Sequence, residues 1–92
     1  LFPEHLENKL AAYIPHPFFI ASISDIVLGE KLCLLIEAAQ YSEEQLNQLK
    51  FLLQQHLKKL EIPKLIYFQK PFIYTESGKI QRKQTMQLLD SR

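Results

Sequence analysis

The chain contains few of the residues that disulfide frameworks and membrane insertion require. Its 92 residues include one cysteine, Cys33, so no internal disulfide can form, and a single thiol is typical of a reducing compartment. No apolar run approaches the roughly 18 residues of a membrane-spanning helix. The formal net charge is only +1, so the charge of the surface as a whole gives no reason to expect a polyanionic binding partner such as a nucleic acid. We therefore expect a cytoplasmic location and no membrane span.

The cysteine and the histidines give no indication of a metal or redox site. Cys33 lies in the apolar run 31–36, and no histidine or positive cluster flanks it, which predicts a buried and inert thiol. His5, His16 and His56 are scattered along the chain and match no zinc-ligand spacing. We therefore expect no metal ligand in this chain.

What the chain does contain is typical of one globular domain. Hydrophobic residues make up 47% of the sequence and charged residues 23%, which argues against disorder. The first residue is Leu1 rather than methionine, and we expect residues 1–92 to be an excerpt of a longer protein.

The first predicted helix begins at Pro3 and Glu4, since proline and an acidic residue are both favoured in a first turn. Pro15 and Pro17 would end it. Its core-facing side is expected to carry four residues at helical spacing: Leu6, Leu10, Tyr13 and Ile14.

The second predicted helix begins at Ser42, because Gln45 lies three residues later and completes a capping box. Pro63 marks the exit from this region. The buried side of the helix is expected to be a leucine stripe that belongs to the core and not to a partner-binding zipper: Leu46, Leu49, Leu53, Leu57 and Leu60.

Residues 18–23, 32–38 and 65–68 are predicted strands, because they are rich in apolar and bulky residues and are bounded by turn signals. A turn at 75–78 and a helix over 82–90, with Met86 and Leu89 facing inward, complete the chain. The order of elements predicts an α+β fold in which a small sheet of about three strands is covered by helices.

The segment from Thr75 to Lys83 is the best candidate for chemistry. Gly78 allows a tight turn, and Lys79 would project from it, beside Arg82 and Lys83 at the start of a helix. A mobile cation on a loop suits binding of carboxylate or phosphate oxygens. Taken alone, the pattern also fits a solvated loop lysine.

Two other interpretations of this basic segment have less support. The paired glycines and the Ser/Thr after lysine of a Walker A loop are absent. Lys70, Lys79, Arg82 and Lys83 could indicate nucleic-acid binding, but acidic residues lie nearby and no aromatic interleaving supports base stacking.

Three motifs in order resemble the C-terminal region of the acyl-CoA synthetase, adenylation-domain and luciferase superfamily, whose members form acyl-adenylates. The closing motif corresponds to Ile62-Pro63-Lys64, then Leu65-Ile66-Tyr67-Phe68, then Thr75 with Ser77-Gly78-Lys79-Ile80 and Arg82. Upstream, Ser24-Asp25 with Leu28-Gly29-Glu30 is similar to the family's Pro-Asp-x-x-x-Gly-Glu, and Pro3-Glu4-His5-Leu6-Glu7 to its Pro-x-Glu-Ile-Glu.

The sequence departs from the family pattern around the threonine. Ile73, Tyr74 and Glu76 replace the usual Pro, Arg and Pro, and Ser24 stands where proline is usual. None of these changes touches the Gly-Lys pair. They indicate a divergent subfamily or a loop of different rigidity.

The resemblance implies that residues 1–92 are the mobile C-terminal lid domain of a two-domain enzyme. The N-terminal domain, which is the expected partner, would bind ATP, Mg²⁺ and the carboxylic acid, and coenzyme A would be the second cofactor. Lys79 would be catalytic in acyl-adenylate formation, with Gly78 positioning it, while Arg82 and Lys83 would contact coenzyme A phosphates or only cap the surface. Asp25 and Glu30 would be structural. The excerpt alone is expected to fold but to be inactive.

The sequence of this chain does not identify the acid that such an enzyme would activate. The compact, divergent region looks somewhat like the o-succinylbenzoate-CoA ligases of menaquinone synthesis. Two alternatives remain: an adenylation domain that loads a carrier protein, and a non-catalytic interaction module that retains the fold.

Overall fold

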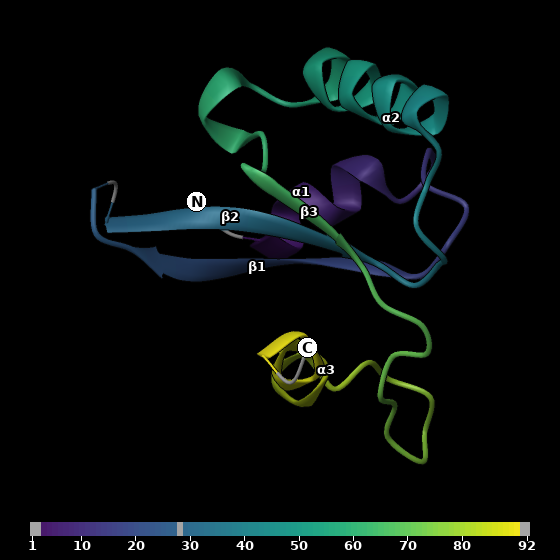
Figure 1. Cartoon of the computed structure of the whole chain (residues 1–92). Coiled ribbons are helices and arrows are strands. Elements are labelled where there is room, and N and C mark those ends of the chain that lie inside the picture. Colours follow the sequence, from purple (N-terminus) through teal and green to yellow (C-terminus); the bar gives the residue numbers. More distant parts are fainter. Residues whose placement is uncertain (1–2, 28, 91–92) are drawn as a thin grey trace.

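The computed structural model describes residues 3–27 and 29–90, and within these ranges a three-stranded sheet organises the fold (Figure 1). Strand β1 (Phe18–Asp25) pairs antiparallel with β2 (Gly29–Ile36), and β2 pairs parallel with β3 (Leu65–Phe68). Gly29 begins β2 opposite Asp25, directly after the hairpin turn, and its φ of 82° is a conformation that glycine adopts without a Cβ penalty. The parallel pairing requires a crossover, which is supplied by the segment that contains α2 (Glu43–His56).

Helices lie on both faces of the sheet. Figure 1 shows α1 (Pro3–Leu10) and α2 above the strands, and α3 (Arg82–Asp90) below them. Alternate residues of β2 therefore enter two separate cores: Leu34 belongs to the first cluster and Leu35 to the second. A strand buried on both faces carries an almost continuous apolar sequence, as β2 does. The predicted α+β fold, with a three-stranded sheet between helices, is confirmed.

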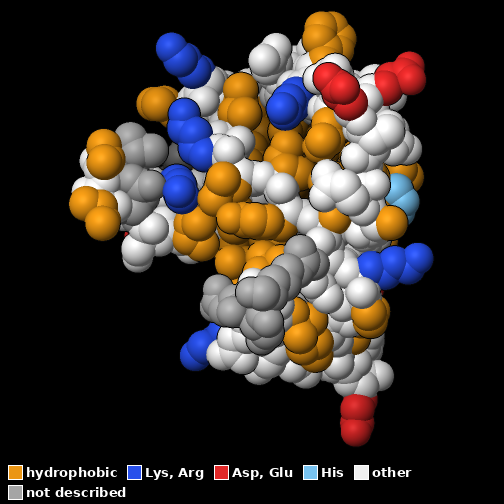
Figure 2. All heavy atoms as spheres, in the orientation of Figure 1, with side chains coloured by type: hydrophobic (Ala, Val, Ile, Leu, Met, Phe, Trp, Pro, Cys, Tyr) orange, Lys and Arg blue, Asp and Glu red, His pale blue; other side chains and the backbone are white. Residues whose placement is uncertain are grey.

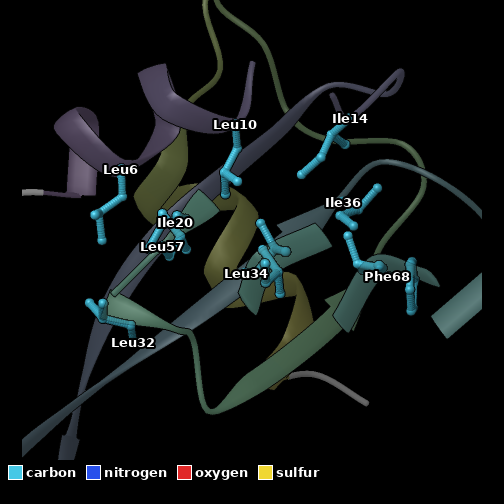
Figure 3. Packing of buried hydrophobic residues seen from close by; sticks show 11 residues of the cluster. Leu6, Leu10, Ile14, Ile20, Leu32, Leu34, Ile36, Leu57 and Phe68 are labelled. Atoms are coloured by element: carbon cyan, nitrogen blue, oxygen red, sulfur yellow. The ribbon is translucent and has the colours of Figure 1, made fainter. Parts of the chain in front are cut away.

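The first cluster joins α1 and α2 to the upper face of the sheet. In Figure 3, Leu6 and Leu10 of α1 point toward Ile20 and Leu34 of the strands. The buried members of this cluster are Leu6, Leu10, Ile14, Ile20, Leu32, Leu34, Ile36, Leu49, Leu53, Leu57 and Phe68.

The second cluster is smaller and connects the sheet to α3. Its buried members are Phe19, Cys33, Leu35 and Phe72, with Ile80, Met86 and Leu89 among the half-buried residues packed against them. Burial raises the pKa of the Cys33 thiol, which keeps it protonated and unreactive. The predictions of a buried Cys33 and of an inward-facing side of α3 are both confirmed.

The capping box at the start of α2 is present as predicted. The backbone N–H of Gln45 donates to Ser42 Oγ at 3.2 Å, and the backbone N–H of Ser42 donates to Gln45 Oε1 at 2.9 Å. Glu43 and Glu44 occupy the first turn, where the helix dipole favours negative charge.

Two predicted core residues are on the surface, because each helix ends earlier than its apolar pattern. The first helix ends at Leu10, and Tyr13 is half exposed and stacks on His56 with ring centroids 4.0 Å apart. The second helix ends at His56, so Leu60 falls in the 3₁₀ turn η1 (Lys59–Glu61) and is 84% exposed. The prolines are therefore not what ends the first helix.

The remaining boundaries differ only slightly from the predictions. Strand β1 runs two residues beyond Ile23, and β2 spans Gly29–Ile36 rather than 32–38. Strand β3 and helix α3 have the predicted limits. Leu28, which belongs to one of the family-like motifs, and the side chain of Asp25 lie outside the described residues. Within the described ranges, no helix is long and apolar enough to cross a membrane.

The different positions of Leu53 and Leu60 predict different costs of truncation. Leu53→Ala removes a side chain that is 1% exposed, and we expect it to lower the free energy of unfolding by about 2–5 kcal/mol. Leu60→Ala is the matched control and should change it by no more than about 0.5 kcal/mol. Urea denaturation of the 92-residue chain followed by circular dichroism would measure both, and equal losses would contradict the assigned packing.

Candidate functional site

The loop between β3 and α3 contains a tight turn that carries Lys79. Tyr74 and Ile80 form an antiparallel bridge across its base. The backbone N–H of Thr75 donates to the carbonyl of Lys79 at 2.8 Å, and the backbone N–H of Gly78 donates to the carbonyl of Thr75 at 2.9 Å. Gly78 has a φ of 88°, in the left-handed region where glycine is favoured. The turn predicted at 75–78 is therefore present.

The side chain of Thr75 completes the turn from inside. Its Oγ1 accepts the backbone N–H of Lys79 at 3.1 Å and lies 3.0 Å from Ser77 Oγ. The backbone of Lys79 is thus held at both its N–H and its carbonyl by the same threonine. Threonine at this position therefore has a direct structural role next to the lysine.

The ammonium group of Lys79 is exposed at the outer end of this fixed backbone. Among residues 3–27 and 29–90 it has no hydrogen bond or ion pair. A lysine ammonium is a compact charge on a flexible stem with three rotatable donors, so it can meet an anionic group that approaches from outside. The arrangement combines a rigid base with a free cation.

Arg82 is placed very differently, although it begins the helix three residues later. Its Nη1 and Nη2 donate to the two carboxylate oxygens of Glu7 at 2.5 and 2.6 Å, and its guanidinium lies 5.7 Å from the ring centroid of Phe19. Glu7 Oε2 also accepts the backbone N–H of Ile20 at 2.9 Å. Arg82 therefore ties α3 to α1 and β1, while the neighbouring Lys83 is exposed. This geometry favours the surface-capping alternative for Arg82.

Two polar side chains that sequence reasoning missed hold the loop in place. The carboxylate of Glu37 accepts the backbone N–H of Phe72 at 2.7 Å and the hydroxyl of Tyr74 at 2.5 Å. The Oγ1 of the fully buried Thr85 accepts the backbone N–H of Ile73 at 3.1 Å and donates to the carbonyl of Gln81 at 2.7 Å. Both ends of the loop are thereby fixed to neighbouring elements.

Only Thr85 left a signal in the sequence. It is a polar residue next to Met86 and four residues before Leu89, on the inward side of the predicted helix. Glu37 follows an apolar strand with no local feature that distinguishes it.

Lys79 is not among the walls of the hollow that lies beside β1 and β2. This hollow of about 420 Å³ is bounded by β1, β2, η1 and the segment after η1. Its walls are Ser22, Glu30, Lys31, Leu32, Leu60, Ile62 and Lys64. The loop between β3 and α3, which carries Lys79, lies instead at the lower right of Figure 1.

The rest of the charged surface is dispersed. Figure 2 shows Lys and Arg side chains spread from the top of this face to its lower left and right, with apolar side chains between them. Within the described ranges, no group of three His, Cys, Asp or Glu side chains could hold a metal ion.

The contact between Tyr74 and Glu37 predicts a pH effect. The hydrogen bond to the Glu37 carboxylate raises the pKa of the Tyr74 hydroxyl from 10.0 to about 12. The folded state therefore holds this proton more tightly, and the resulting stabilisation is complete below about pH 10 and is lost as the pH rises toward 12. Tyr74→Phe should lower the free energy of unfolding at neutral pH, and this difference from the wild type should shrink above pH 10. Urea titrations across this range would measure it, and a constant difference would contradict the assignment.

Comparisons with known proteins give structural matches only. No known family profile matches the sequence, and no curated protein sequence does. The chain is similar over 97% of its length to an acyl-CoA synthetase (AMP-forming)/AMP-acid ligase II-like protein from Dyadobacter fermentans DSM 18053, with 32% identity and a TM-score of 0.86. It spans 27% of that protein's chain.

Two further solved structures share the fold at lower identity. ATP-bound MatB from Rhodopseudomonas palustris has 18% identity and a TM-score of 0.73, over 99% of this chain and 18% of its own. The amide bond synthetase McbA from Marinactinospora thermotolerans has 20% identity and a TM-score of 0.71, over 95% of this chain and 18% of its own. The chain thus has the fold of one part of these proteins, and it spans about a quarter or less of the length of each.

Proposed function

We propose that these 92 residues are the C-terminal lid domain of an ATP-dependent carboxylic acid–CoA ligase, and that Lys79 is the catalytic cation of its first half-reaction. The observation that carries the proposal is the free ammonium of Lys79 on a turn whose backbone is fixed by Thr75. The similarity over 97% of the chain to an acyl-CoA synthetase (AMP-forming)/AMP-acid ligase II-like protein supports it, because a region of similar fold makes up 27% of that protein's chain.

In the proposed reaction, a carboxylate oxygen of the substrate attacks the α-phosphorus of ATP. A new P–O bond joins acyl group and AMP, and the bond to the leaving pyrophosphate breaks. Negative charge spreads over the oxygens around phosphorus in the transition state, and a cation in a water-excluded site stabilises it. Lys79 has the right charge and reach for this role, because its ammonium has no partner among the described residues of its own domain.

The other components would come from the N-terminal domain. We propose that it holds ATP, Mg²⁺ and the acid, since Lys79 lies outside the hollow described above and the described residues offer no cluster of metal ligands. The lid domain would then rotate and withdraw Lys79. The thiol of coenzyme A would attack the acyl carbon of the acyl-adenylate, so that a thioester forms and AMP leaves. Lys83, which is exposed beside the loop, stays a candidate contact for coenzyme A phosphates, whereas Arg82 would need to leave Glu7 to serve as one.

The acid and the acceptor are the less constrained parts of the proposal. We propose o-succinylbenzoate, in menaquinone synthesis, as the first acid to test, because this compact, divergent region looks somewhat like the corresponding region of o-succinylbenzoate-CoA ligases. An adenylation domain that loads a carrier protein remains the alternative, and the amide bond synthetase with this fold indicates that acceptors differ between proteins that share it. A non-catalytic module would require that Lys79 have no effect on catalysis.

The proposal predicts a selective effect of Lys79→Ala in the full-length protein. Carboxylate-dependent pyrophosphate release should fall by roughly a few hundredfold, because one charged donor to the transition state is lost. Acyl-CoA formation from ready-made acyl-adenylate should stay close to that of the parent. A coupled pyrophosphate assay and a chromatographic acyl-CoA assay would measure the two steps separately.

Lys50→Ala is the matched control, since Lys50 is an exposed lysine on α2, on the opposite face of the sheet. It should leave both half-reactions unchanged. If Lys79→Ala releases pyrophosphate as fast as the parent, the Ser77-Gly78-Lys79 turn is not catalytic and the non-catalytic module becomes the better reading. The isolated 92 residues should fold and form no acyl-CoA.

A further inference from the structure

We propose that Glu37 is a positioning residue for Lys79: its carboxylate sets the orientation of the loop, and with it the place of the ammonium during adenylate formation. This inference rests on the proposed function of Lys79. It concerns a residue that lies 35 positions before Phe72, to which it binds, and that has no hydrogen bond or ion pair with Lys79 or with residues 75–78.

Glu37 is held firmly at the end of β2. Its backbone N–H donates to the carbonyl of Pro17 at 2.9 Å, which continues the pairing of β2 with the segment before β1. Its side chain therefore starts from a backbone that is hydrogen-bonded to the neighbouring strand segment, directly after the end of β2. A carboxylate fixed in this way can impose a position on the groups that bind it.

Both carboxylate oxygens are used by the loop, and by alternate residues. Oε2 accepts the backbone N–H of Phe72 at 2.7 Å, and Oε1 accepts the hydroxyl of Tyr74 at 2.5 Å. Hydrogen bonds to an ionised acceptor are short and stronger than neutral ones. Because two points on one strand-like segment are held by one group, the segment can neither slide nor rotate about a single contact.

A continuous series of contacts leads from this anchor to the lysine. Tyr74 pairs with Ile80 across the base of the turn, and Ile80 directly follows Lys79. Thr75, which directly follows Tyr74, binds the backbone of Lys79 from the opposite side of the turn. A change in the direction of Tyr74 would therefore move the whole turn, including the stem of Lys79.

The stability of the whole domain does not by itself account for the hydrogen bond between Glu37 and Tyr74. Tyr74 is 39% exposed, so solvent screens its hydrogen bond, which adds less to the folding free energy than a buried bond of the same kind would. The apolar anchor of the loop is Phe72, which is buried edge-on against Phe19 with ring centroids 5.4 Å apart. Phe72 fixes where the loop joins the core, whereas the Glu37–Tyr74 contact fixes where the loop points.

The test compares Glu37→Ala and Glu37→Gln in the full-length protein, alongside Lys79→Ala. Glu37→Ala should reduce carboxylate-dependent pyrophosphate release by roughly ten- to a hundredfold, because a displacement of about 1 Å can cost that much. Acyl-CoA formation from ready-made acyl-adenylate should change by less than about twofold, since Lys79 is not used there. Glu37→Gln should recover most of the loss, because its amide oxygen can accept from Phe72 and its NH₂ can donate to the Tyr74 oxygen.

Glu61→Ala is the matched control for loss of a structural carboxylate. Glu61 also accepts one backbone N–H, from Lys58 at 2.9 Å, and one side-chain donor, Lys9 Nζ at 3.1 Å, but it lies in η1 on the other face of the sheet (Figure 1). It should leave the ratio of the two half-reactions unchanged, even where thermal denaturation shows a lower melting temperature.

The outcomes separate this inference from the proposed function. Loss of adenylation in Lys79→Ala but not in Glu37→Ala would refute the role of Glu37 and leave the function of Lys79 in place. An equal loss of both half-reactions in Glu37→Ala, matched by Glu61→Ala, would show a purely structural role and overturn the inference. Full adenylation by Lys79→Ala would refute the proposed function, and the inference with it.

Discussion

The burial of β2 on both faces is the constraint on which the other elements depend. Because Leu34 and Leu35 point to opposite sides, the sheet needs a layer of cover above and another below. Helices α1 and α2 supply the first layer. The second must come from the chain that follows β3, which has to leave the sheet edge and pass beneath it before α3 can pack. The loop that carries Lys79 is this passage between the two layers.

A loop in that position has backbone groups that no strand or helix can satisfy, and buried or half-buried backbone donors need partners. Glu37, directly after β2, and Thr85 in α3 provide them, so the loop is attached both to the end of the neighbouring strand and to the helix that follows it. The same contacts that satisfy the backbone also fix the direction of the turn. The hydrogen bonds that satisfy the backbone donors of the loop are therefore also the ones that determine the position of Lys79.

Local patterns allowed most of the fold to be predicted, and the failures have a common physical cause. Ser42 with Gln45, and the short bulky strand 65–68, carry their signals within a few residues. The predictions that Tyr13 and Leu60 face the core were wrong, because the apolar spacing continues beyond the residue at which each helix ends. Periodicity shows which residues could share a helix face, but the end of the helix is decided by tertiary contacts and capping.

The candidate site divides in the same way. The turn around Gly78 follows from local chemistry, since glycine is favoured at a positive φ. The partners of the loop do not: Glu37 binds Phe72 across 35 residues, and Glu7 binds Arg82 across 75. No pattern within a short window encodes such pairs, because they exist only once the strands and helices have packed. The role of a residue such as Glu37 therefore has to be read from the structure.

The contrast between Lys79 and Arg82 follows from their side chains as much as from their places. The planar guanidinium of Arg82 matches the two oxygens of Glu7 and is held between α1, β1 and the Phe19 ring. Lys79 has a compact charge on a flexible stem and no partner among the described residues. A domain that is proposed to present a cation in one step and remove it in the next requires this division. The backbone beneath the cation must be rigid, so that moving the domain moves the charge, and the charge itself must not be bound within the domain. The fixed turn and the unpaired ammonium of Lys79 meet both conditions, whereas the paired Arg82 meets only the first.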